Sequence, residues 1–307
     1  MTTIAALVVA LGLAGLGAQD VPASAPQEQP AVPPVQETPV EEIEVVGRPL
    51  RRLVDTFVDA AVAPPAGRGP ARWPRKVCVG VVNLQREAAQ ALADRVSEVA
   101  LELELEIGEP GCSPNILIVA TDDGAGLASA LVAERPLAFR PKYAGASRSE
   151  RALERFQTSD AAVRWWHVSL PVVRDTGEPA VRLPGELPPM IPGGSRLRTE
   201  VQNDLLRAYV IVDVDGPAAL TLPQLADYVA MVAFAQINPD ADLSAYPTIL
   251  NLFANPAAVQ GMTDWDMAYL RSLYAAELNQ RNPGAQNGAA GNIMFRDRLR
   301  AQEQATE

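Results

Sequence analysis

The stretch of residues 222–237 constrains the fold more than any other part of this sequence. After Asp227 it reads Tyr-Val-Ala-Met-Val-Ala-Phe-Ala-Gln-Ile, which makes a helix apolar on nearly every face. Such a helix is stable in water only when other elements cover it on all sides. Asn238 and Pro239 then end the helix. The chain is therefore expected to build its layers around one central, buried helix.

Four short runs of apolar residues predict β-strands. They span residues 77–83, 115–121, 163–170 and 208–214. The second run is apolar throughout, as expected for a strand covered on both faces. A Pro- and Gly-rich connection, residues 171–204, separates the last two strands. Because it is too long for a passive turn, it suggests a lid or flap.

Helices are predicted between and after these strands. Four apolar residues between the first two strands have the i, i+4, i+7, i+11 spacing of one helical stripe: Leu92, Val96, Val99 and Leu103. Shorter helices are expected near residues 50–61 and 126–134. Thr263 is a good N-cap, and the two aspartates that follow it lie where a helix dipole favours negative charge. A last helix is therefore expected to begin there.

The order of these elements resembles the zincin metalloprotease domain, specifically its metzincin branch. In that family the buried helix carries a His-Glu-x-x-His motif, and a turn containing methionine underlies the metal. Here Thr248-Ile249-Leu250-Asn251 is similar to the turn, and residues 262–274 are similar to the final helix. The chain is also similar to an exported proteobacterial family of unknown function whose zincin motif is incomplete. The resemblance covers about residues 76–275 and implies an α+β fold with a mixed sheet, a central buried helix and a C-terminal helix.

The metal-binding residues of the zincin family are missing from this chain. Residues 227–231 occupy the place of the motif, with Asp227 and Met231 at the two imidazole positions and Tyr228 at the general base. Catalytic zinc needs three protein ligands and a carboxylate that takes the proton of the bound water. The resemblance thus implies a degenerate site with no metal, cofactor or catalytic residue. It leaves these residues as candidates for lining the former groove: Asp227, Tyr228, Met231, His167 and Trp166.

The composition excludes several further classes of catalytic site and of binding partner. His167 is the only histidine, so it cannot supply the two or three imidazoles of common zinc sites. It is interpreted as a packed, hydrogen-bonded residue, with a general base as the alternative. The motifs Gly-x-Ser-x-Gly, Ser-x-x-Lys and the P-loop do not occur. A net charge of −11 argues against nucleic acid as a partner.

The N-terminal segment predicts export. Residues 4–17 are apolar but too few to span a bilayer, which is typical of a secretory signal peptide covering residues 1–18, with cleavage as late as residue 25. A Pro-rich, disordered linker is expected at 19–47. Within it, residues 41–48 resemble the segment that opens the plug of TonB-dependent receptors, although a single edge strand is the favoured interpretation. A globular domain at 48–277 and a polar tail at 278–307 follow. The expected location is periplasmic or secreted, with no integral membrane segment after cleavage.

Two cysteines fit an oxidising compartment. Cys78 lies in the first predicted strand, and Cys112 lies just before the second. If these strands are neighbours, the two thiols can form a disulfide, which would stabilise the fold by about 3–4 kcal/mol through loop entropy. Two buried free thiols are the alternative.

Three functions from different classes are consistent with these features. The favoured one is a non-catalytic, zincin-like exported protein that binds a peptide or an envelope protein in the former active-site groove, where the ligand adds a strand to a sheet edge. The second is a hydrolase that uses His167 with a nearby carboxylate such as Asp227. The third is a structural envelope component whose Pro-rich N-terminus spans the periplasm.

Overall fold

The computed structural model describes residues 47–187, 189, 191, 193–215 and 220–306 of the chain. The predicted signal peptide lies outside the described residues. The same is true of the predicted linker and of segment 41–48, except for Gly47 and Arg48, which begin helix α1 (Gly47–Ala61).

A four-stranded mixed sheet with the order β2-β4-β6-β5 forms the centre of the fold. Strands β2 (Val79–Val82), β4 (Ile116–Thr121) and β6 (Val201–Asp213) are parallel. Strand β5 (Val163–Val173) runs antiparallel to β6 and is the last strand in the order. Each predicted run of apolar residues overlaps one of these strands, although β5 and β6 extend beyond the predicted bounds. The α+β class expected from the sequence is confirmed.

The long connection is shorter than the sequence suggested. Strands β5 and β6 continue to pair as far as Val173 and Val201, so residues 174–200 form the connection instead of 171–204. A second, two-stranded sheet pairs β1 (Lys76–Val77) with β3 (Glu106–Ile107).

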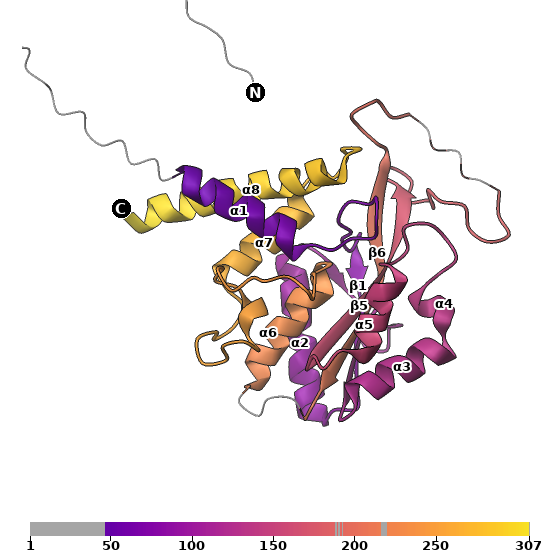
Figure 1. The fold of residues 1–307 in the computed structure, drawn as a ribbon, viewed down its shortest axis with the longest axis vertical. Helices are drawn as coiled ribbons and strands as arrows, with labels where there is room; N and C mark the ends of the chain where they lie inside the picture. Colours follow the sequence, from indigo (N-terminus) through magenta and orange to yellow (C-terminus); the bar gives the residue numbers. More distant parts are fainter. Residues whose placement is uncertain (1–46, 188, 190, 192, 216–219, 307) are drawn as a thin grey trace, which may run out of the picture. The chain divides into compact units, whose positions relative to one another are not determined.

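Helices cover both faces of the four-stranded sheet (Figure 1). Helices α2 (Arg86–Glu102) and α6 (Leu222–Phe234) share one large core with the strands. On the opposite face, a smaller core joins the sheet to helices α3 (Gly124–Glu134), α4 (Pro136–Phe139) and α5 (Glu150–Thr158).

Helix α6 is the central helix that the sequence predicted. Every residue from 229 to 235 is fully buried, so the expectation that this apolar helix is covered on all sides is confirmed. Its start is fixed by a capping box. The Thr221 hydroxyl accepts from the amide of Gln224, and the Gln224 side-chain oxygen accepts from the amide of Thr221. The helix therefore gives a rigid base on which neighbouring side chains can be positioned.

The apolar turn and the last predicted helix are locked together by Asp266. Helix α7 (Asp264–Ala275) begins at the Thr263 cap, as predicted. The buried carboxylate of Asp266 accepts from the Thr248 hydroxyl and from the amides of Ile249 (2.8 Å) and Thr263 (2.9 Å). Turn η1 (Ile249–Asn251) is thereby held at a fixed place beside α6.

The C-terminal residues differ from the predicted polar tail. Most of residues 278–307 form helix α8 (Pro283–Thr306), which packs on α1 and α7. The helix is anchored by a few apolar side chains, such as the buried Ala290 and Met294, within an otherwise polar sequence. Packing against these residues stabilises the helix.

The predicted disulfide between Cys78 and Cys112 is present, with the two Cα atoms 6.1 Å apart. It connects the junction of β1 and β2 to the turn that precedes β4. Across the described residues, no helix combines the length and apolar character needed to cross a membrane.

Candidate functional site

A groove of about 480 Å³ follows strand β5 near its N-terminal end. Helix α5 forms one wall, with Ala152, Arg155 and Phe156 facing the groove. The opposite wall comes from Tyr228 of α6 and from the turn after it, with Leu250 and Phe253. The groove is thus an aromatic and aliphatic channel between the two helical layers.

The edge of β5 inside this groove carries unpaired main-chain groups. The amide of Asp213 donates to the carbonyl of Ala162 (2.7 Å). Because bonded pairs alternate along an antiparallel ladder, the next main-chain groups that face β6 belong to Arg164 and Trp166. The N–H and C=O groups of residues 163, 165 and 167 therefore point outward. No other main-chain segment of the described chain pairs with them.

Side chains alternate between the two faces of β5, and this separates two of the predicted groove residues. Trp166 faces α5, where its indole donates to the carbonyl of Phe139 (2.8 Å). Trp165 and His167 face α6, and the Trp165 indole donates to the carbonyl of Ile237 (3.0 Å). Trp166 and His167 therefore lie on opposite faces of the sheet.

Tyr228, predicted to lie in the groove, forms part of its wall. Its ring makes edge-to-face contacts with Phe253 (4.8 Å between centroids) and Trp165 (6.1 Å). Burial raises the pKa of the Tyr228 phenol above its ordinary value. The Tyr228 side chain therefore stays neutral and offers an aromatic surface to the groove.

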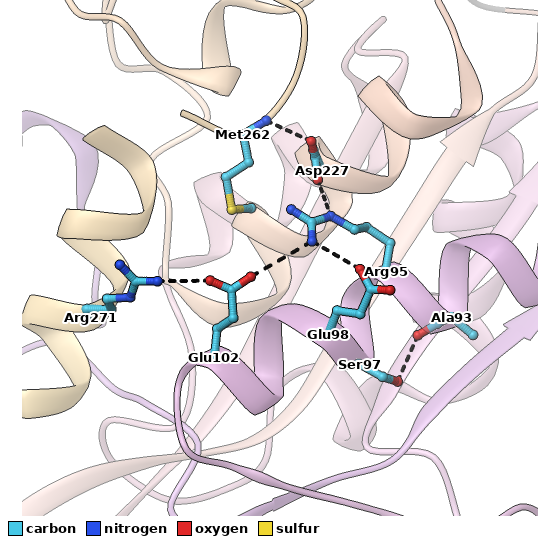
Figure 2. A network of polar contacts seen from close by, with 8 residues as sticks. All are labelled: Ala93, Arg95, Ser97, Glu98, Glu102, Asp227, Met262 and Arg271. Atoms are coloured by element: carbon cyan, nitrogen blue, oxygen red, sulfur yellow. Dashed lines mark hydrogen bonds and ion pairs between the residues drawn. The ribbon is translucent and has the colours of Figure 1, made fainter. Parts of the chain in front are cut away.

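Asp227 does not line the groove. It lies in a network of charged residues (Figure 2). One carboxylate oxygen accepts from Arg95 Nε of α2 (2.5 Å), and the other accepts from the amide of Met262 (2.7 Å). The network continues to Glu98, Glu102 and Arg271. Asp227 thus joins α6 to α2 and to the segment before α7, which is a structural role.

Met231 and His167 do not reach the groove surface either. Met231 is fully buried in the main core. His167 lies in a separate cavity of only about 10 Å³, beside Ala63, Arg148 and Gln236. Burial lowers the pKa of His167 to about 4, so the imidazole is neutral near pH 7. The structure places His167 next to the carbonyls of Val232 and Ala233, more than one helical turn from Asp227.

The residues that the sequence resemblance assigns to the zincin metal positions do not fit a zinc ion. The Asp227 carboxylate is neutralised by Arg95, Tyr228 is part of an aromatic wall, and Met231 is packed in the core. Among the described residues, no three His, Cys, Asp or Glu side chains are grouped so that they could hold a metal.

No family model, curated protein or solved structure matches this chain. The resemblance to zincins is therefore an expectation from the sequence, drawn from the order of the elements and from the residues of the turn and the final helix.

Three charged groove residues were not predicted. Arg155 Nη2 lies 2.8 Å from Asp240 Oδ2, and Arg148 Nη2 lies 3.7 Å from the same oxygen. Arg155 lies in α5, whereas Arg148 precedes the Ser149 cap of that helix. Nothing in the sequence indicates that Asp240, in the loop after α6, lies across from them.

Proposed function

We propose that this chain is a non-catalytic peptide-binding protein in which an extended peptide adds a strand to the outer edge of β5. One observation carries the proposal: the main-chain groups of residues 163, 165 and 167 are unpaired, and Val163 and Trp165 line the groove of about 480 Å³. In strand addition the main chain supplies affinity, and pockets for alternate side chains supply specificity. The groove offers both.

The two walls suggest which peptide side chains are favoured. A peptide residue opposite Trp165 shares its face of the sheet and meets Tyr228 and Phe253. Its two neighbours project to the other face and meet Phe156 and Ala152 of α5. Both sets of contacts are mainly apolar, so the preferred ligand is a peptide with aliphatic or aromatic residues.

We infer in addition that the fold is a degenerate, zincin-like one. The order of the elements supports this inference, because it is the order expected from the sequence: β2, α2, β4, antiparallel β5, β6, buried α6, η1 and α7. The disulfide is compatible with a periplasmic or secreted location, in which an envelope protein would supply the peptide.

Peptide binding can be tested with N-terminally fluorescein-labelled hexapeptides that vary Val, Leu, Ile, Phe and Ala, monitored by fluorescence anisotropy. We expect a subset to bind with saturation. Methylating alternate amide nitrogens of a bound peptide should abolish binding when the methylated amides face β5, and the opposite set should be tolerated.

A matched pair of variants locates the site. Ala254 is exposed in the groove wall, whereas Ala258 is exposed nearby and outside the groove. Ala254→Arg should weaken binding by about tenfold or more, equivalent to about 1.4 kcal/mol, and Ala258→Arg should leave it unchanged. Failure of every peptide to saturate, or equal effects of the two variants, would contradict the proposal.

A further inference from the structure

We propose that the groove binds the free C-terminus of its peptide, with the terminal carboxylate at Arg148 and Arg155. This inference deepens the proposed peptide binding and rests on it. It is argued from the way one end of the groove is closed and from the charge found at that end.

The groove is closed at one end and open at the other. Beyond His167 the edge of β5 is covered, because the amide of Ser169 donates to the carbonyl of Ala146 (2.7 Å) and its hydroxyl donates to the carbonyl of Gly145 (3.1 Å). Near Val163 the groove meets a second apolar cleft of about 220 Å³. A bound strand can therefore leave past Val163, but at the His167 end it meets the segment that leads to Arg148.

Positive charge exceeds negative charge around Arg148. Arg148 and Arg155 share one carboxylate, that of Asp240. The Asp240 carboxylate lies 2.8 Å from Arg155 but 3.7 Å from Arg148, which is longer than a hydrogen bond. Helix α5 also begins here, after its Ser149 cap, and its N-terminal pole adds positive potential. One further carboxylate would complete this cluster.

A terminal carboxylate fits better than an acidic side chain. A peptide bearing an acidic side chain at this point would need to continue past it, where segment 145–146 already covers the strand edge. A peptide that ends here does not need that space. Because its C-terminus lies at the His167 end, the peptide would run parallel to β5, with large apolar residues just before the carboxylate.

The test compares three forms of the best-binding hexapeptide from the library: the free acid, the C-terminal amide, and the same sequence extended by three glycines. We expect the free acid to bind at least about tenfold more tightly than the other two, because a charge-assisted hydrogen bond to a guanidinium is lost in both. Arg148→Gln should bring the free acid and the amide to equal affinity. Arg151→Gln, which removes an exposed arginine of α5 outside the groove, should preserve the difference.

Each outcome has a defined meaning. If the free acid and the amide bind the unaltered protein equally well, or if the glycine extension is tolerated, the C-terminal inference is wrong while peptide binding stands. If Arg148→Gln weakens the binding of the free acid and of the amide equally while the thermal unfolding of the variant is unchanged, Arg148 does not bind the carboxylate. If no peptide binds at all, the proposed function itself fails.

Discussion

Substitution of Asp227 distinguishes a structural residue from a groove residue. The side chains of Arg95 and Asp227 are 30% and 13% exposed, so water screens their contact only in part. Asp227→Ala removes a charge-assisted bond to Arg95, about 1.5–3 kcal/mol, and a bond from the Met262 amide, about 0.5–1.5 kcal/mol. Arg95 keeps its contact with Glu98, so the arginine is not left unpaired. We therefore expect a loss of about 2–3 kcal/mol of unfolding free energy.

For a domain of this size that loss corresponds to a fall in Tm of roughly 5–10 °C. Asp227→Asn keeps an acceptor and should cost about half as much. The matched control is Asp94→Asn on the exposed face of α2, expected to change stability by less than about 0.5 kcal/mol. Urea unfolding followed by circular dichroism measures the free energies, and peptide anisotropy should show unchanged affinity for all three variants. A stable Asp227→Ala protein that has lost peptide binding would refute the reasoning, because Asp227 would then belong to the ligand site.

Three further outcomes are expected. Replacing both Cys78 and Cys112 by serine should lower the unfolding free energy by about 2–5 kcal/mol, and reducing agent should then leave the Tm of the variant unchanged. Burial raises the pKa of Asp204 to about 6, so the contribution of this residue to stability falls as pH rises from about 4 to 6. The unfolding free energy of Asp204→Asn should therefore increase relative to that of the unaltered protein across this pH range, by less than about 3 kcal/mol. Burial lowers the pKa of His167 to about 4, so the stability that this residue contributes is lost as pH falls from about 6.5 to 4. In His167→Gln the unfolding free energy, measured with urea, should depend less on pH in this range, and peptide affinity should be unchanged.

The parts of the fold that sequence predicts well are those whose signal is local. The uniform apolar character of residues 229–235 requires burial on every side, whatever surrounds the helix. Thr263 and Asp266 specify a helix start within four residues. The cysteine pair depends only on the first two long strands being neighbours, and β2 and β4 are paired.

The groove was harder to predict because it depends on side-chain direction and on distant segments. Trp166 and His167 are adjacent in a strand, and the two-residue period alone places them on opposite faces. Asp227 and Tyr228 are likewise adjacent in α6, where successive side chains point about 100° apart, so only Tyr228 reaches the groove. The second wall comes from α5, and the Arg155–Asp240 pair joins residues 85 positions apart, which no local pattern indicates.

The free edge of β5 raises the question of why copies of this chain would not pair with one another through it. Exposed strand edges promote aggregation unless they are short, covered or charged. Here the unpaired stretch covers only residues 163–167, ends where segment 145–146 closes it, and lies between α5 and the turn that follows η1. A single extended peptide fits between such walls, whereas the edge of a second folded sheet carries helices that would collide with them. The same walls that make the groove selective for a peptide therefore also protect the protein from edge-to-edge association. Ala152→Asp, which adds charge to the α5 wall, should consequently weaken peptide binding without changing the molar mass measured by light scattering.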